Sequence, residues 1–329
     1  MHEAISTPER NEYRPSADSR LRREQTAVYA PLDSDSLIRR YFDNRTAFTG
    51  LSRGILQLMY PRLGAGVAEH SDFFEDPWDR IMRSLPWIHG VVFDADGDAT
   101  GRQVRGFHNT IHGTDEKGRK YHALEPETFW WAHATFFDMA RDNADTFSHH
   151  TLSAAERARM YSESLTWYKR YGMPMRDVPT DYWSFYDKWN DICDNVLEMT
   201  PAAEKAVEKA LTHDSEKLPM VPEEIWPLVK LPAANVLGRL AIGGLPERVR
   251  ERFAIPFSSS DKVQYELFAL AIRQNWWLVP DRVRYHPRAY EGIKHDRRHE
   301  PWPNLLRPRS MINFATETTY AVYDKVSQY

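Results

Sequence analysis

The sequence predicts an all-α protein, folded as a single large multi-helix domain with long loops and a loose N-terminal arm. Three observations carry this prediction. Apolar residues recur at three- and four-residue spacing in one segment after another, which is the periodicity of amphipathic helices. Strand-like alternation of apolar and polar residues is scarce. No internal repeat of about 20 to 50 residues is visible, which argues against a solenoid or a propeller.

The predicted domain follows an arm of different composition. Residues 1–34 are rich in Arg, Glu, Ser and Pro and poor in apolar residues, which is typical of a flexible segment. We therefore expect the helical domain to span 35–329. Its predicted helices, in chain order, are 35–47, 52–59, 73–92, 104–112, 126–140, 153–171, 180–197, 233–240, 245–253, 260–277 and 314–326.

Local signals mark several helix ends. Ser153 is followed three residues later by Glu156, the capping-box pattern that begins a helix, and Gly172 ends the same segment. Pro61 interrupts the helix predicted before it, and prolines between 219 and 232 mark a connection.

Composition excludes several classes of protein. Hydrophobic residues make up 42% of the chain, enough for a sizeable core, and the net charge of −4 gives no basic field for a nucleic acid partner. The one cysteine, Cys193, cannot form an intramolecular disulfide and is expected in the core. The chain opens on charged residues and holds no apolar run long enough to cross a membrane. We therefore expect a cytoplasmic protein, with a peripheral membrane contact left open.

Four of the 13 histidines fall between residues 104 and 140. His108 and His112 recur at helical spacing with apolar neighbours, and Gly113 stands where a C-cap glycine would end the helix. The spacing therefore predicts that His108 and His112 share one helical face. The polar residues 114–121, with Gly118 in their middle, predict an exposed turn or a short hairpin.

The next helix is predicted to place a third histidine among aromatic residues. Pro126 stands at the tolerated first position of this helix. Trp130, His133 and Phe137 then lie on one stripe of it. We expect His133 to point into an aromatic environment.

Three interpretations of these histidines stay open. Each could be a core histidine hydrogen-bonded to a backbone carbonyl. His108 and His112 could instead hold a mononuclear metal ion, with Asp115 or Glu116 as a third ligand. One histidine could also ligate haem, which requires an apolar pocket and cationic side chains for the propionates. Residue spacing alone does not choose among them.

Five segments together carry a resemblance to a known family. They are LMYPRLGAGVAEHSDFFEDPWDRIMRS (58–84), VRGFHNTIHGTDEKGRKYHALEPETFWWAHAT (104–135), YSESLTWYKRYGMPMRDVPTDYWSFY (161–186), LPERVRERFAIPFSSSD (245–261) and WWLVPDRVRYHPRA (276–289). In these segments, their order and their spacing, the chain resembles the catalytic domain shared by the bacterial rubber oxygenase called latex clearing protein and by MpaB, the fungal membrane-bound oxygenase of mycophenolic acid biosynthesis.

The resemblance implies an all-helical fold, haem b as the iron cofactor and oxidative cleavage of carbon–carbon double bonds. It also implies residue roles. The family's Arg-x-x-x-Thr corresponds to Arg80 and Ser84, and its haem-ligating histidine corresponds to His108. A second family histidine is matched by His133, which is the alternative ligand. Serine in place of threonine keeps the hydroxyl and loses the methyl group that restrains its orientation.

Two arginines are candidates for binding the haem propionates. Arg105 lies three residues before His108, where a cation could reach a propionate. Arg80 is the other candidate. Without the resemblance, Arg80 would be interpreted as a surface residue paired with Asp76 four residues earlier, and Arg105 as the partner of a carboxylate.

These observations lead to one functional expectation and two alternatives. We expect a haem b-dependent oxygenase that takes dioxygen and an apolar small-molecule or lipid-like substrate, in a pocket built from helices 52–60, 104–112 and 126–140. The first alternative is a non-haem metalloenzyme that uses the His-x-x-x-His pair. The second is a non-catalytic haem-binding or scaffold protein.

Overall fold

The computed structural model describes residues 27–71, 75–213, 215–218 and 221–299. Within these residues the protein is helical apart from one short hairpin, so the all-α prediction is confirmed. The predicted helix 314–326 and most of the predicted arm lie outside the described residues. Among the described helices, none combines the length and the apolar character that crossing a bilayer requires.

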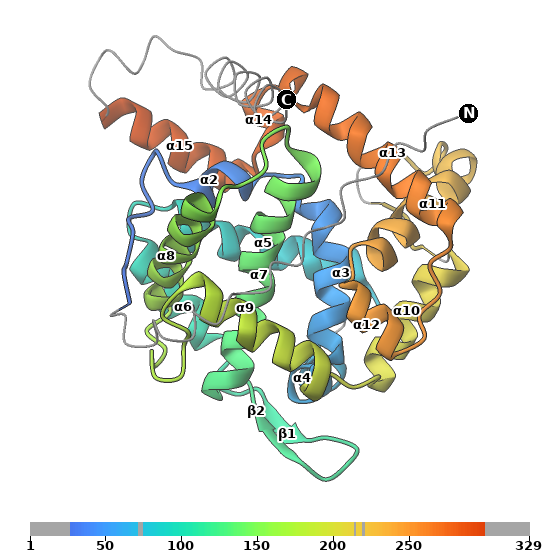
Figure 1. Ribbon diagram of the computed structural model, residues 1–329, viewed down its shortest axis with the longest axis horizontal. Helices are drawn as coiled ribbons and strands as arrows, with labels where there is room; N and C mark the ends of the chain where they lie inside the picture. Colours follow the sequence, from blue (N-terminus) through green and yellow to red (C-terminus); the bar gives the residue numbers. More distant parts are fainter. Residues whose placement is uncertain (1–26, 72–74, 214, 219–220, 300–329) are drawn as a thin grey trace, which may run out of the picture.

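Helix α7 (Pro126–Phe147) runs through the middle of the molecule (Figure 1). Pro126 stands in its first turn, as predicted, because a proline there loses no helical hydrogen bond. Large side chains on several sides of α7 are buried, among them Trp131 and Phe137, so the helix is enclosed by its neighbours. Helices α2 (Leu37–Tyr41), α3 (Thr46–Met59) and α8 (Ala154–Arg170) pack against it.

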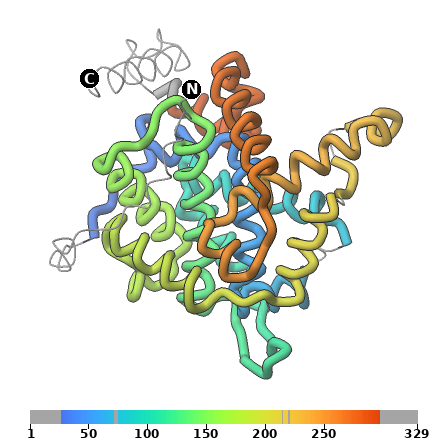
Figure 2. Tube along the Cα trace, turned by 45° about the vertical axis from the view of Figure 1, so that its right-hand side comes forward, coloured from blue at the N-terminus to red at the C-terminus, as the bar shows by residue number. Residues whose placement is uncertain are grey.

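The remaining elements lie on either side of this centre (Figures 1 and 2). Helix α6 packs against α5 and α8, and α15 packs against α5. On the other side α11 contacts α3, α10 and α13. Their bounds are α4 (Pro61–His70), α5 (Pro77–Phe93), α6 (Gly97–Gly106), α9 (Tyr182–Asp191), the π-helix η2 (Ile192–Val196), α10 (Pro201–Thr212), α11 (Trp226–Gly243), α12 (Glu247–Arg252), α13 (Ser259–Asn275), the 3₁₀ turn η3 (Trp276–Leu278), α14 (Asp281–Arg284) and α15 (Pro287–His299).

A buried ion pair joins α3 to α7. The guanidinium of Arg53 donates hydrogen bonds to Asp138, lies 2.9 Å from Asp142 and donates a 2.9 Å hydrogen bond to the carbonyl of Gly244. All three charged side chains are buried. Because a buried charge is tolerated only with partners, this network fixes the register of the two helices.

Several predicted boundaries were wrong. The stretch 35–47 is not one helix, because α2 ends at Tyr41 and the carboxylate of Asp43 holds a turn by accepting the backbone N–H of Arg45 at 3.0 Å. Helix α4 begins directly at Pro61, where only a break was predicted. The prolines between 219 and 232 were predicted to mark a connection, but helix α11 begins at Trp226 and contains Pro232.

The last residues of the predicted arm contact α8. The carbonyl of Ala30 accepts a 2.6 Å hydrogen bond from the hydroxyl of Thr166, and its N–H donates to the carbonyl of Ser162. Leu32 is buried. The described part of the arm therefore lies against this helix.

Candidate functional site

The candidate site lies where four elements meet. The first turns of α5 supply Arg80 and Ser84, the turn that follows α6 supplies His108, and the first turns of α7 supply Phe129. The C-terminal end of α8 contributes Tyr171, whose ring contacts Phe129 at 5.2 Å between centroids. Arg80 and Phe129 therefore lie near the imidazole of His108, Ser84 contacts Arg80, and Tyr171 contacts Phe129.

His108 is a partly buried, neutral histidine with one ring nitrogen committed. Its Nδ1 lies 2.8 Å from the carbonyl oxygen of Val104, so Nδ1 carries the proton and donates it. Nε2 then holds the lone pair and makes no hydrogen bond to a described residue. Burial lowers the pKa of His108, and the nearby charge of Arg80 lowers it further. The rings of Phe129 and His108 pack edge-to-face, with 5.7 Å between their centroids.

Arg80 is held by two serines. Its Nε donates a 3.1 Å hydrogen bond to the hydroxyl of Ser71, and one Nη donates to the hydroxyl of Ser84 one helical turn onward. Ser84 in turn donates to the carbonyl of Arg80 at 3.0 Å. Arg80 is thus hydrogen-bonded to Ser84 and lies near enough to His108 for its charge to lower the pKa of that histidine. Asp76 caps the helix by accepting the N–H of Asp79 at 2.9 Å.

The prediction that His108 and His112 share a helical face was wrong. Helix α6 ends at Gly106, residues 107–110 form turns, and His112 begins strand β1 (His112–Thr114). This strand pairs in antiparallel fashion with β2 (Lys120–His122), so the predicted short hairpin is confirmed. The side chain of His112 is exposed and stacks on His122 across the hairpin.

The carboxylate proposed as a third metal ligand is used by the hairpin itself. Asp115 accepts the backbone N–H groups of Lys117 and Arg119 at 3.0 and 2.8 Å and closes the turn that contains Gly118, whose φ is 76°. Within the described ranges, no three or more His, Cys, Asp or Glu side chains are arranged to hold a metal ion.

His133 lies in the aromatic environment that the sequence predicted. The centroid of its ring lies 5.0 Å from the ring centroids of Trp167 and Tyr168, and the residue is 5% exposed. Nε2 lies 2.9 Å from the hydroxyl of Ser164, whereas Nδ1 is buried without a hydrogen-bond partner. Burial lowers the pKa of His133 to about 3, so the ring is neutral.

Arg105 is exposed and serves a helix end. Its Nη1 donates a 3.2 Å hydrogen bond to the carbonyl of Gly172, just after α8. Gly172 has a φ of 68°, the left-handed conformation that ends helices.

Sequence reasoning missed a close contact between α6, the helix that precedes His108, and the end of α8. A Cβ atom at Gly101 would lie 2.3 Å from the carbonyl oxygen of Arg170, and one at Gly97 would lie 2.3 Å from the Arg170 guanidinium. The two glycines, four residues apart on one face of α6, therefore let this helix approach the end of α8 closely. The Gly-x-x-x-Gly spacing in the printed sequence was the available signal.

The class of protein follows from the fold together with its relatives. The described residues form a helical fold in which His108 lies near Arg80 and packs against Phe129. The chain belongs to the family described as ER-bound oxygenase mpaB/B'/rubber oxygenase, catalytic domain, whose model matches residues 38–274. The resemblance found in the sequence is thereby confirmed. The protein is an oxygenase-family enzyme, and such an enzyme takes dioxygen and an organic substrate. No curated protein and no solved structure matches the chain.

Proposed function

We propose that this protein is a haem b-dependent oxygenase with His108 as the protein ligand to the iron and an apolar small molecule or lipid-like compound as substrate. The observation that carries the proposal is the state of the His108 ring. Nδ1 donates to the carbonyl of Val104, and the pKa is lowered, so a neutral imidazole presents Nε2. Histidines that ligate metals usually donate their other N–H to such an acceptor, which fixes the tautomer and the ring orientation.

The neighbouring residues fit haem as well. Haem propionates are costly to bury without cations, and Arg80 is close enough to His108 to lower its pKa. The two serines that hold Arg80 restrict its guanidinium in advance, so less conformational entropy is lost on binding a carboxylate. Gly106 has open space where a Cβ would stand, so the turn leading to His108 is not crowded on that side. Arg105 is the second candidate cation, although its guanidinium already binds the carbonyl of Gly172.

The residues of the chain would have distinct tasks in this enzyme. When bound, haem supplies the chemistry that activates dioxygen. His108 would ligate the iron, Arg80 would bind a propionate, and Ser84 would keep Arg80 in place through its hydroxyl. The rings of Phe129 and Tyr171 would form a dry wall that excludes water and favours an apolar substrate.

His133 suits a supporting task better than ligation. Its Nε2 is already hydrogen-bonded to Ser164, and the ring is enclosed by Trp167 and Tyr168. Because Tyr168 and Tyr171 also contact Phe129, His133 can influence the substrate wall through these aromatic side chains. In this proposal His133 supports the aromatic side chains that line the substrate pocket and does not ligate the iron.

The absorption spectrum of the purified protein tests the proposal. A Soret band at about 400 nm is expected if haem is bound. A colourless sample with stoichiometric iron or zinc would favour a non-haem enzyme. A colourless, metal-free sample that haem does not reconstitute would favour a scaffold and would overturn the haem proposal.

A further inference from the structure

One arginine of α15 connects the two helices that lead to the candidate site. Arg288 stands in the first turn of α15, and its guanidinium donates hydrogen bonds to both carboxylate oxygens of Asp94, at 3.0 and 2.5 Å. Asp94 is the C-cap residue of α5, the helix that carries Arg80. The same guanidinium donates a 3.4 Å hydrogen bond to the hydroxyl of Thr100 on α6, the helix that leads to His108. Arg288 therefore bridges the end of α5 and the beginning of α6.

The carboxylate of Asp94 is the centre of this junction. The hydroxyl of Thr100 donates a 2.7 Å hydrogen bond to it, so Asp94 binds both α6 and α15. The side chains of Arg288 and Asp94 are only 31% and 23% exposed, and water and salt screen a sheltered ion pair less than an open one. The planar fork of the arginine, bound to both oxygens, also fixes the relative orientation of the two side chains.

The part of α5 that Arg288 contacts is weakened by a proline. Pro86 lies inside α5 and has no N–H to donate to the carbonyl of Met82, a loss that kinks or loosens a helix. Arg288 donates a 3.1 Å hydrogen bond to the carbonyl of Pro86, and its guanidinium lies 5.2 Å from the ring centroid of Trp87. A Cβ atom at Gly90 would lie 2.5 Å from the Cζ atom of Arg288, so this glycine leaves the room that the guanidinium needs. Arg288 thus restrains α5 from outside, where the helix restrains itself less.

Trp87 carries this restraint to the turn that holds His108. The rings of Trp87 and Phe107 pack edge-to-face, with 5.0 Å between their centroids, and Phe107 directly precedes His108. Arg80, Ser84 and Trp87 are separated by four and three residues, so they share one stripe of α5. The charge of Arg80 lies near enough to lower the pKa of His108. A shift of α5 relative to α6 would therefore disturb both the Trp87 contact and the placement of Arg80.

Helix α15 has a second tether that is independent of Arg288. Asp296, in its C-terminal half, pairs with Arg39 of α2. Arg39 also donates hydrogen bonds to the carbonyls of Val92 and Phe93, and it keeps these two when Asp296 is removed. A substitution of Asp296 therefore loosens α15 without removing any contact of the Arg288 guanidinium.

We propose that Arg288 is a positioning residue of the candidate site: from α15 it fixes α5 against α6, and thereby the placement of Arg80 relative to His108. The inference rests on the proposed function, because it assigns Arg288 to the haem site. Arg288 acts through Asp94, Thr100 and Trp87.

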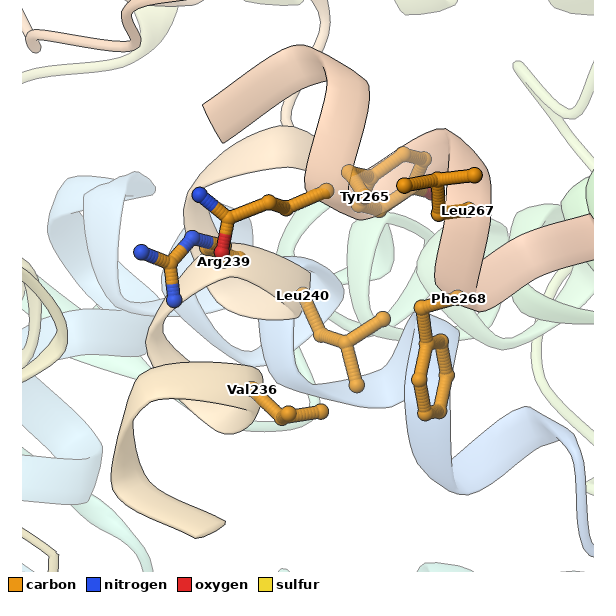
Figure 3. A pocket seen from close by; sticks show the side chains of 7 residues that line it. Val236, Arg239, Leu240, Tyr265, Leu267 and Phe268 are labelled. Atoms are coloured by element: carbon orange, nitrogen blue, oxygen red, sulfur yellow. The ribbon is translucent and has the colours of Figure 1, made fainter. Parts of the chain in front are cut away.

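The pocket between α11 and α13 provides a control (Figure 3). It has a volume of about 220 Å³ and is lined by Val236, Arg239, Leu240, Gln264, Tyr265, Leu267 and Phe268. None of these residues belongs to the candidate site or to the surroundings of Arg288 described above. Haem that adhered to this apolar surface would bind independently of Arg288, so Leu267→Ala should affect only such adhesion.

Hydrogen exchange of the full chain without haem tests the positioning. Mass spectrometry compares the wild type with Arg288→Ala, Arg288→Lys and Asp296→Ala in a peptide that spans residues 105–111. Exchange there should be about tenfold faster in Arg288→Ala, because the hydrogen bonds of a charged group are lost. Arg288→Lys should give a smaller increase, since lysine keeps the charge without the planar fork. Asp296→Ala should exchange as the wild type does, and a peptide within α7 should be unchanged in every variant, which excludes general unfolding.

Haem titration of the same proteins tests the consequence for binding. Arg288→Ala should weaken haem affinity by about tenfold, the lower end of the losses seen when the residues that orient a metal ligand are removed. Asp296→Ala and Leu267→Ala should retain the affinity of the wild type. In an Arg80→Ala background the further loss caused by Arg288→Ala should be smaller, because the side chain that Arg288 positions is absent.

Three results would overturn the inference. Wild-type exchange at 105–111 in Arg288→Ala would show that the turn is held without this residue. An equal effect of Asp296→Ala would assign the change to the docking of α15 as a whole, and an undiminished loss in the Arg80→Ala background would show that Arg288 does not act through Arg80. A wild type that binds no haem would overturn the proposed function, whereas the exchange rates would still decide whether Arg288 holds the turn.

Discussion

The guanidinium of Arg80 and the hydroxyl of Ser84 are hydrogen-bonded one turn apart on α5, and the hydroxyl donates in turn to the carbonyl of Arg80. Ser71 holds the same guanidinium from the other side at 3.1 Å. A side chain so restrained is preorganised to bind an anion, whereas a free surface arginine loses conformational entropy when it does so. This relationship supports the assignment of Arg80 to the proposed haem site.

The Arg80 assignment predicts a graded loss of haem affinity. Arg80→Ala should weaken binding by about tenfold or more, equivalent to ~1.4 kcal/mol or more, because a propionate loses its cation. Arg80→Lys should weaken it less, since lysine keeps the charge and loses the planar fork. Titration of haem into the apo forms measures both. Arg83→Ala is the control, because Arg83 pairs with Asp79 on the exposed side of the same helix; equal affinities in all four proteins would remove Arg80 from the site.

Ser84 is predicted to act through Arg80. Ser84→Ala removes the acceptor of the guanidinium and should lower haem affinity by less than Arg80→Ala does. Ser84→Thr restores the hydroxyl of the family pattern and should retain the affinity of the wild type. In an Arg80→Ala background the Ser84→Ala change should have no further effect, and a full additional loss there would show that Ser84 acts independently.

The close approach of α6 and α8 predicts opposite outcomes for two glycines. Gly101→Ala places a methyl group 2.3 Å from the backbone carbonyl of Arg170, which cannot move aside as a side chain can, so it should destabilise the protein by about 1–3 kcal/mol. Gly106→Ala meets nothing within 4 Å and should be neutral or stabilising by up to ~1 kcal/mol. Urea unfolding compares the two; a stable Gly101→Ala protein would contradict the contact.

The buried histidines predict a loss of stability in mild acid. Burial lowers the pKa of His133 and of His89 to about 3. In the unfolded chain both titrate near the ordinary value, so below about pH 6.5 the unfolded state binds protons that the folded state does not. The free energy of unfolding should therefore fall with decreasing pH, by about 1.4 kcal/mol per pH unit for each such histidine, until pH approaches the folded pKa.

Urea titrations between pH 6.5 and 5 isolate this effect, because ordinary carboxyl groups titrate lower. The variant His133→Leu should reduce the slope by about 1.4 kcal/mol per pH unit, whatever it does to stability at pH 7. A slope equal to that of the wild type would show that His133 is protonated in the folded protein.

The sequence predicted the helices better than it predicted the histidine geometry. Strong local signals, such as Pro126 before α7 and the capping box of Ser153 and Glu156, were sufficient to locate helix starts. The four-residue spacing of His108 and His112 was misleading, because it is equally compatible with a turn followed by a strand. The structure has a strand there because His112 pairs with His122 across the hairpin. The spacing of residues within one segment does not reveal such a contact.

The members of the candidate site were proposed from the sequence, but the contacts among them could not be. The family resemblance selected Arg80, Ser84 and His108, whereas the hydrogen bond of the His108 ring to Val104 and the contact with Phe129 depend on how α6 and α7 pack. Arg105 was selected by its spacing from His108, and the structure shows it bound to the end of α8. Close packing of helices is a tertiary property that a linear pattern does not contain.

The measurement that tests the haem proposal most directly is a haem titration of His108→Ala beside His133→Ala and His112→Ala. Loss of the axial ligand should abolish the Soret shift, or weaken affinity by about 100-fold or more, in His108→Ala alone. His112→Ala should bind haem as the wild type does, because that side chain is exposed on the hairpin. His133→Ala should keep the Soret maximum nearly unchanged. Retention of wild-type haem binding by His108→Ala, or its loss in His133→Ala instead, would contradict the assignment of His108 as the ligand.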